Sequence, residues 1–483
     1  SSTYDYNFDV VLNTTDRANN VINYQYDNIG RLTKIIAPKE AYNSDPYTIS
    51  FQYMPTYSQA QVNGYGSFVT QNNFIPFAVT KHYDTQHPTD PIETINFIDG
   101  LGKNIQVKKD IEVNTGSPQE PNYEQKMSVS GYVTNDVWGR AIKSYQPRSE
   151  DKNNTINFLI NQAATPNTSF NLVEYDVLDR TTKTIDMEGN ESVMSYTIAN
   201  DPFGTLALKT KSQVQQNNTT LLINESFTDI KGQNISTLNA GSIKTKFDYD
   251  AIGQLMAYTD DQIINTTYKY DVAGRKTQVT HPDSGTTKYQ YDEASNLTKV
   301  QTANLEQQGT AIEYYYDINR VSKIRFPDVA GVANVADVTY QYGLPNIGNS
   351  SGRLIEQNDA TGKQVFTYGV MGETTLIDRT IKAPNLPTRL FSTRFSYDSF
   401  NRIQNLTYPD GEIVTYSYNK GGNLNKMTTQ LNGQDYEYVK QIDYDYFEQK
   451  TYMKYGNNTE TVYNYSPELR RLQNLNVKAS DGQ

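Results

Sequence analysis

The sequence predicts an all-β protein made of β-hairpins that pair side by side into one long, curled and largely single-layered sheet. Three observations predict this fold class. The dipeptide Tyr-Asp returns at regular intervals, at Tyr249, Tyr270 and Tyr291, which are 21 residues apart. Turn-forming residues stand at fixed offsets after it. The chain has 39 Tyr among 483 residues but only 36% hydrophobic residues, too few aliphatic side chains for a two-layered sandwich of this size.

The repeating unit is clearest from Tyr270. Gly274 follows at the fourth position and Arg275 at the fifth, Pro282 at the twelfth, and the next Tyr-Asp begins at Tyr291. A second copy starting at Tyr397 has Asn401, Arg402, Pro409, Tyr416 and Tyr418 at equivalent positions.

Each element of this unit has a physical reading. The Asp after Tyr can accept a backbone N–H two residues on and so begin a turn. Gly, Asn or Asp at the fourth position tolerates positive φ, which a turn ending in a left-handed residue requires. A strand-length run, RKTQVT, follows, then a second turn at HPDSG and a second strand, TTKYQY. One unit is therefore a two-stranded hairpin of about 20 residues.

The motif recurs along most of the chain. The side chains to which we assign a structural role in the repeat are Tyr26, Asp27, Gly30, Arg31, Tyr175, Asp176, Arg180, Tyr249, Asp250, Gly253, Tyr270, Asp271, Gly274, Arg275, Tyr291, Asp292, Tyr397, Asp398, Asn401 and Arg402. Turns are predicted at 27–30, 176–179, 271–274 and 398–401. Because side chains alternate along a strand, Tyr289 and Tyr291 share one face. We expect such tyrosines to stack ring on ring between neighbouring hairpins.

Domain organisation is predicted to be a single array over residues 1–483, less regular in 1–245 and regular in 246–483. Segments rich in Asn, Gln, Ser and Pro interrupt it near 41–96, 111–131, 148–172 and 198–222, and we interpret these as surface loops or longer irregular hairpins. The chain begins SSTYDY, and we interpret it as an internal part of a longer protein.

Composition excludes several classes of function. A net charge of −11 disfavours nucleic-acid binding, which needs a basic surface. The absence of Cys excludes disulfides and thiolate metal sites. No apolar run reaches the roughly 18 residues of a membrane span.

These motifs resemble the YD repeats of the Rhs superfamily. YDNIGRLTKI, YDVLDRTTKTI, YDAIGQL, YDVAGRKTQV and YDEASNLTKV match its Y-D-x-x-G-R-L-x-x-[VI] signature, and FIDGLGKNIQVKKD at 97–110 resembles a variant of the Tc toxin B component and SpvB-like proteins. The resemblance, which also extends to teneurins, implies that the hairpins spiral into a hollow shell around a toxic segment. In this family the shell commonly closes with a region that carries a D-P-x-G motif, where an aspartyl-type self-cleavage releases the toxin. Here DPFG, at Asp201 to Gly204, lies mid-chain among further repeats, and we interpret it as a turn.

Candidate chemical sites are few. His82 and His87 are five residues apart, an odd spacing that points them to opposite faces of a strand, so solvated loop histidines are favoured over a metal pair. His281 occupies a turn position, and the recurring Asp residues are accounted for by turns, which disfavours a glycosidase. Trp138, the only Trp, is expected to pack against the sheet. We predict no catalytic residue, cofactor or metal.

Two functions from different classes remain. The first is the encapsulating shell of a secreted or delivered bacterial toxin, with the rest of the polypeptide, a toxin cargo or other toxin-complex subunits as partners and an extracellular or cell-surface location. The second is a cell-surface binding module whose exposed Tyr contact glycans or protein receptors. Neither is enzymatic.

Overall fold

The computed structural model describes residues 1–60, 74–152, 169–216, 220–240, 242–328, 335–345 and 347–479. These residues form antiparallel strands joined by short turns. The described helices are short: α1 (Pro38–Asn43), α2 (Tyr57–Ala60), α3 (Ala303–Gln307) and the 3-10 helix η5 (Gly348–Ser350).

The N-terminal sheet has ten strands among the described residues, and each pairs with the next. Its strands in order are β1 (Ser2–Asp5), β2 (Val10–Thr15), β3 (Val21–Tyr26), β4 (Leu32–Ile36), β5 (Ile49–Met54), β6 (Phe77–His82), β7 (Ile92–Ile98), β8 (Asn104–Asn114), β9 (Tyr123–Ser130) and β12 (Arg148–Asp151).

The second sheet has 28 strands within the described part of the chain, again in chain order. They are β10 (Val133–Asn135), β11 (Ala141–Tyr145), β13 (Phe170–Tyr175), β14 (Thr181–Ile185), β15 (Glu191–Asn200), β16 (Leu206–Gln216), β17 (Thr220–Thr228), β18 (Asn234–Asn239), β19 (Ile243–Tyr249), β20 (Leu255–Thr259), β21 (Asn265–Tyr270), β22 (Lys276–His281), β23 (Gly285–Tyr291), β24 (Leu297–Gln301), β25 (Ile312–Asp317), β26 (Arg320–Arg325), β27 (Val338–Tyr342), β28 (Leu354–Asp359), β29 (Gly362–Tyr368), β30 (Thr374–Ile381), β31 (Arg389–Tyr397), β32 (Ile403–Thr407), β33 (Ile413–Tyr418), β34 (Leu424–Leu431), β35 (Gln434–Tyr444), β36 (Lys450–Tyr455), β37 (Glu460–Tyr465) and β38 (Leu472–Lys478).

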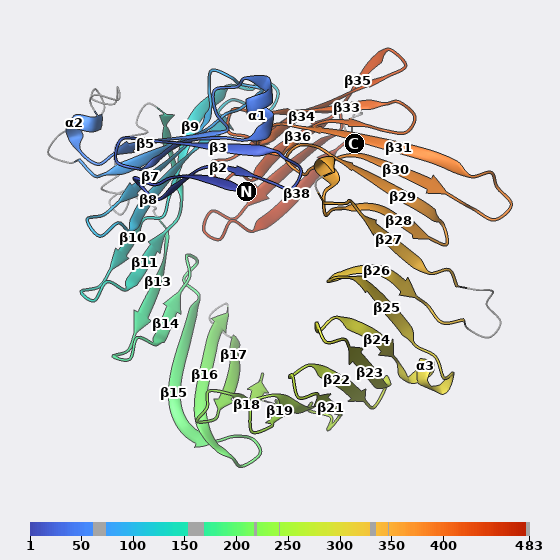
Figure 1. The fold of residues 1–483 in the computed structure, drawn as a ribbon. Coiled ribbons are helices and arrows are strands. Elements are labelled where there is room, and N and C mark those ends of the chain that lie inside the picture. The colour runs from blue at the N-terminus through green and yellow to red at the C-terminus, as the bar shows by residue number, and fades with distance from the viewer. Residues whose placement is uncertain are drawn as a thin grey trace.

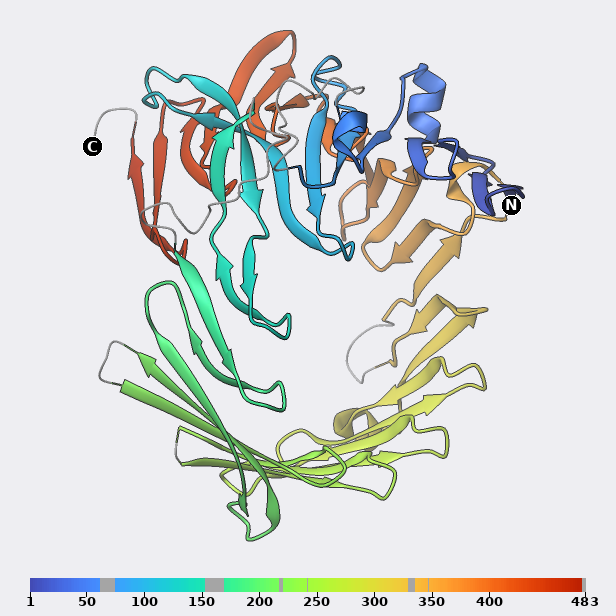
Figure 2. The same cartoon turned by 90° about the vertical axis from the view of Figure 1, so that its left-hand side faces the viewer.

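The ribbon curls round on itself, as the predicted fold class requires. Figure 1 shows the strands passing in sequence round a ring, from the blue N-terminal strands through β15–β24 to the red C-terminal strands. The later strands of the N-terminal sheet and the C-terminal strands lie side by side in this view and in the view at right angles to it (Figure 2), and β8 contacts β35. No strand pairing joins them among the described residues, so the sheet spirals and does not close as a barrel.

The segments expected as loops are largely strands. Residues 41–96 contain β5, β6 and most of β7. Residues 111–131 lie mainly in β8 and β9, whose register partners run from the pair Val107 and Ser130 to the pair Asn114 and Tyr123. Residues 198–200, 206–216 and 220–222 belong to the long pairs β15–β16 and β16–β17. The surface-loop interpretation was therefore wrong for these parts, whereas longer hairpins were right. Residues 61–73, 153–168 and 217–219 of these segments lie outside the described residues.

One of these segments also carries the main hydrophobic core. Met54, Phe77, Val79, Ile95 and Phe97 are almost fully buried on β5, β6 and β7, and α2 packs against β5. The helix makes this part of the wall thicker than a single layer. A second, smaller cluster of buried apolar side chains, Val439, Ile442 and Tyr444, lies on β35.

Turns form at all four predicted stretches. In the turn after Tyr270, Asp271 Oδ1 accepts the backbone N–H groups of Ala273 and Arg275, at 3.0 and 2.9 Å, and Gly274 N donates to Asp271 O. The fourth-position residues Gly30, Asp179, Gly274 and Asn401 have φ of 81°, 60°, 80° and 60°. Each turn coincides with a register shift of the flanking strands, as in a bulged hairpin turn.

The Arg of one repeat lies over the Tyr ring of the next. We expected the Tyr rings to stack on one another, and this expectation is corrected. The hydroxyl of Tyr270 donates to Leu255 O, and the Arg275 guanidinium lies 5.0 Å from the ring centre of Tyr291 in the next repeat. The same Arg-over-Tyr contact joins Arg31 to Tyr53, Arg180 to Tyr196 and Arg402 to Tyr418. Cation–π contacts of this kind contribute roughly 0.5–1 kcal/mol each at exposed sites. The hairpins are thus linked by alternating cations and rings.

The turn geometry gives a first prediction. Gly274→Val should destabilise the protein by about 1 kcal/mol or more, because a β-branched residue resists the positive φ at this position. Gly274→Asn is the matched control, since Asn401 adopts the same conformation in the sister turn. Thermal unfolding of the two variants and the parent provides the comparison. A Val variant as stable as the parent would contradict the assigned turn conformation.

Candidate functional site

The two ends of the spiral meet along a boundary made of turns. Four successive turns of the C-terminal strands, at 398–401, 419–422, 445–448 and 466–470, contact the β6–β7 loop (residues 83–91), β8, β9 and Gln146. We call this boundary the seam. It joins the two sheets by side-chain contacts where strand pairing does not.

Contacts across the seam keep a nearly constant separation in sequence. Ser399 donates to Tyr83 O, 316 residues away, Asn114 donates to Asp443, 329 residues away, and Lys109 donates to Glu448, 339 residues away. An isolated contact between Asn20 and Asn349 has a separation of 329. One turn of the spiral therefore takes 316 to 339 residues, and this chain of 483 residues makes about one and a half turns.

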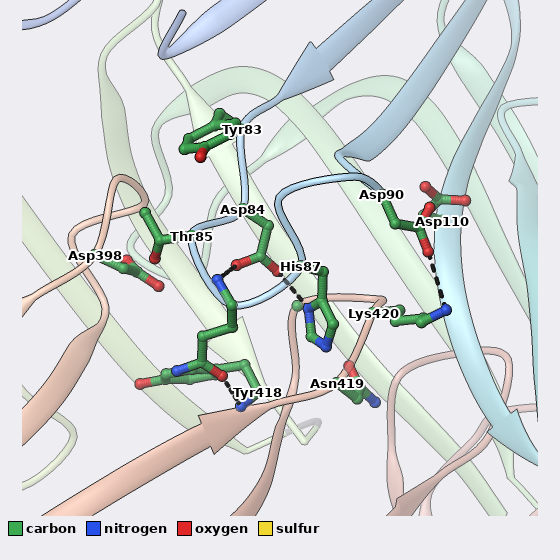
Figure 3. A network of polar contacts seen from close by, with 12 residues as sticks. Tyr83, Asp84, Thr85, His87, Asp90, Asp110, Asp398, Tyr418, Asn419 and Lys420 are labelled. Atoms are coloured by element: carbon green, nitrogen blue, oxygen red, sulfur yellow. Dashed lines mark hydrogen bonds and ion pairs between the residues drawn. The ribbon is translucent and has the colours of Figure 1, made fainter. Parts of the chain in front are cut away.

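Arg402 is the central side chain of the seam. In its own turn its Nε donates to the buried carboxylate of Asp398 at 2.6 Å, as the Arg of the turns at 27–30, 136–139, 176–179 and 271–274 does. Its Nη2 also reaches Asp84 in the β6–β7 loop at 3.1 Å, and the Asp84 side chain is fully buried. His87 Nδ1 lies 3.0 Å from the other oxygen of Asp84 (Figure 3). Arg402 thus makes a second ion pair, which joins two successive turns of the spiral.

Phe400 lies between Arg402 and His82. The guanidinium of Arg402 is 4.5 Å from the ring centre of Phe400, and the His82 imidazole stacks on Phe400 with ring centres 3.7 Å apart. His82 Nε2 is buried and has no hydrogen-bond partner. The expectation of two solvated loop histidines was wrong, because His82 ends β6 inside the seam and His87 is paired with Asp84.

Gln86 pairs with the backbone of β33 as an edge strand would. Its side-chain Nε2 donates to Tyr416 O at 3.0 Å, and its Oε1 accepts Tyr418 N at 2.8 Å. Tyr418 stands at a register shift between β33 and β34, where the strand's polar groups need other partners.

The second turn of the seam combines charge and close packing. Lys420 pairs with Asp90 at 3.3 Å, and Lys152 bridges Asp90 and Asp110 at 3.1 and 3.0 Å. Burial raises the pKa of the Asp110 carboxyl to about 6, although Lys152 acts in the opposite direction. Gly421 lies against the backbone of β8: a Cβ there would be 2.9 Å from Ile111 Cα. The turn fits only because this residue has no side chain.

Polar contacts extend the seam to its far end. Tyr123 donates to Asp443 at 2.9 Å, and Gln146 donates to the backbone carbonyls of Pro467 and Glu468 at 2.9 and 2.6 Å. All four C-terminal turns therefore take part.

The motif residues outside the seam serve the repeat itself. The hydroxyls of Tyr26, Tyr175, Tyr249, Tyr270, Tyr291 and Tyr397 each donate to a backbone carbonyl of an earlier strand, at 2.7–3.1 Å. Asp27, Asp176, Asp250, Asp271, Asp292 and Asp398 organise their turns through backbone N–H groups, with Gly253 in the left-handed conformation. The structure spreads these residues along the sheet and brings only Asp398, Asn401 and Arg402 to the seam.

Turns away from the seam expose apolar tips. Leu101, Val177, Ile230 and Val272 are exposed at the two central positions of these turns, which Ser399 and Phe400 occupy in the 398–401 turn. Trp138 is 76% exposed at such a tip, with the Arg140 guanidinium 4.9 Å from its ring, so the expectation that it packs against the sheet was wrong. Asp201 to Gly204 form a repeat-type turn, as interpreted from the sequence, with Gly204 at φ 91°.

His281 lies at the end of β22, beside the 281–285 turn, where its Nδ1 accepts Asp283 N. In the described ranges no three His, Cys, Asp or Glu side chains converge on a point that could hold a metal ion. No helix of the described residues is long and apolar enough to cross a membrane.

Comparison with known proteins identifies the type of repeat. A family model described as RHS Repeat matches residues 249–286 and 397–434. These two stretches are RHS repeats. The matched repeats contain the turns at 250–253, 271–274, 398–401 and 419–422, so the second match enters the seam. No curated protein matches the sequence.

Solved structures show the same fold for this chain. It is similar over its whole length to TcdB2-TccC3 without the hypervariable C-terminal region (TM-score 0.80, 17% identity, 28% of that chain covered) and to TcdB2-TccC3 (TM-score 0.78, 17% identity, 26% covered). It is equally similar to the Photorhabdus luminescens Tc holotoxin pore (TM-score 0.78, 17% identity, 28% covered). The chain thus spans little more than a quarter of the length of these solved chains.

Proposed function

We propose that residues 1–483 are one array of repeats that forms part of the wall of a bacterial toxin shell, enclosing a toxic segment until delivery. The array is less regular in 1–245 and regular in 246–483, and its motif residues have structural rather than catalytic roles. Its partners are the rest of the same polypeptide or a toxin cargo, together with other toxin-complex subunits, and its site of action is outside the producing cell or at its surface.

The observation that carries this proposal is the seam. A wall that encloses a segment must have no opening between successive turns of the spiral. Here four β-turns of the C-terminal strands are held against the previous turn of the spiral by buried ion pairs and stacked rings. An adhesive module would need its repeat tips free. In the seam those tips are used for internal contacts. The likeness to the Tc complexes supports the same role.

Limited proteolysis of the whole polypeptide that carries this chain tests the proposal. We expect a fragment from outside residues 1–483 to resist protease while the wall is intact and to be cleaved at least tenfold faster when the seam is weakened by Arg402→Met. Arg275→Met, in a repeat away from the seam, is the matched control. Equal cleavage in all three proteins would overturn the enclosing role, and specific binding of the intact chain to a glycan array would favour a surface binding module.

A further inference from the structure

His82 is placed where the spiral is held closed. It ends β6, its ring stacks on Phe400 from the opposite end of the chain, and Phe400 is in turn covered by Arg402. His82 Nε2 is enclosed without any hydrogen-bond partner. A neutral imidazole tolerates such a position, whereas an imidazolium must bury an additional N–H donor and a charge.

The charges around His82 do not offset the cost of its burial. From the C-terminal turn, Asp398 and Arg402 face it, together with the backbone of Ser399. From its own loop Asp84 faces it. Both carboxylates are already engaged with Arg402. On the strands to either side its register partners are Ile49 and Ile92, which carry no charge.

We propose that His82 makes the seam an acid-sensitive latch, which holds the spiral closed near neutral pH and loosens when the imidazole takes up a proton. A proton on His82 places a second cation against Phe400, opposite Arg402. Opening the seam releases the imidazole to water and frees both its nitrogens to donate. The latch thus acts on the contact between turns and leaves the hairpins of each turn intact.

The direction of the effect follows from linkage. Burial lowers the pKa of His82 below its usual value, so the closed seam binds fewer protons than the open one. The stability of the closed seam is therefore complete above a pH of about 6.5 and declines as the pH falls below it. At pH 5 the ratio of open to closed seam can rise by up to about 30-fold relative to pH 7.5.

One nearby group acts in the opposite direction. The pKa of Asp110, near 6 in the folded protein, lies above the usual value, so its protonation on acidification favours the folded state. Asp110 therefore cannot produce a loosening at low pH, and substitutions of His82 separate its contribution from those of the other titratable groups of the seam.

Hydrogen exchange at pH 7.5 and pH 5, corrected for the intrinsic exchange rates, tests the latch in the intact chain. We expect the protection of residues 83–87 and 399–402 to fall by about tenfold or more at pH 5, within the linkage limit. The turn at 271–274, far from the seam, should keep its protection. Unchanged protection at the seam between the two pH values would overturn the proposal.

Variants assign the effect to one side chain. His82→Phe keeps an aromatic ring against Phe400 but cannot be protonated, and it should remain protected at both pH values. His82→Gln, which is also neutral, provides a second variant if the Phe side chain overpacks the site. His87→Gln should keep the acid response. A response that survives both His82 variants, or that disappears with His87→Gln alone, would overturn the assignment to His82.

Discussion

Arg402→Met is expected to open the seam at a cost of about 3 kcal/mol, because breaking a buried ion pair leaves an uncompensated charge. The substitution removes one cation from two carboxylates, Asp84 and Asp398, whose side chains have no exposed surface. It also removes the cation lying over Phe400 and Tyr418. The protection of residues 83–87 against hydrogen exchange should fall by about a hundredfold.

Arg275→Met is the matched control for this experiment. Arg275 makes the same contacts within its repeat, an ion pair with Asp271 and a cation–π contact with Tyr291, but the pair is partly exposed and lies away from the seam. Its loss should cost about 1 kcal/mol. The difference between the two variants measures the inter-turn contacts of Arg402. Equal losses would show that Arg402 contributes to its repeat alone.

Gly421→Leu should also separate the turns, by a purely steric route. A Cβ at this residue would lie 2.9 Å from Ile111 Cα and 2.9 Å from Glu112 N, and these backbone atoms of a paired strand cannot rotate away. Overpacking of this kind costs about 1–3 kcal/mol. Hydrogen exchange should therefore quicken in β8 and in the 419–422 turn, as measured in the intact chain.

Gly100→Leu controls for the added side chain. Gly100 lies in the repeat-type turn at 99–102, and a Cβ there would have no atom within 4 Å. The stability of this variant should stay within about 0.5 kcal/mol of the parent. If Gly421→Leu proved equally neutral, the 419–422 turn would not lie against β8 as the structure places it.

The repeat could be predicted from sequence because its determinants are local. Tyr, Asp, the left-handed residue and Arg fall within six positions, and each has a conformational reason to be there. The partner of each Tyr was harder to predict. Arg275 and Tyr291 are 16 residues apart and belong to different hairpins, and the period alone does not show that the guanidinium, rather than another ring, covers the tyrosine.

The seam could not be predicted from the sequence in this way. Arg402 looks like every other repeat Arg, and its second partner, Asp84, lies 318 residues away in a segment without the motif. Gln86 and His82 belong to the same segment, where polar composition indicated loops. The available signals were indirect: Phe400 is an aromatic residue at a turn tip where several other repeats carry aliphatic ones, such as Ile29, Leu178 and Ile252, and Gly421 adds a second glycine to its turn.

The nearly constant separation of 316 to 339 residues across the seam fixes the length of chain in one turn of the spiral. In open solenoid arrays each repeat contacts only its neighbours, so repeats can be gained or lost with little effect elsewhere. Here, removing the 21 residues from Asp271 to Tyr291 would delete one hairpin and carry Arg402 past Asp84, Gln86 past β33 and Gly421 past β8 at once. The number of hairpins between the two sides of the seam is therefore fixed by the seam contacts. Evolutionary changes in length should be confined to loop tips.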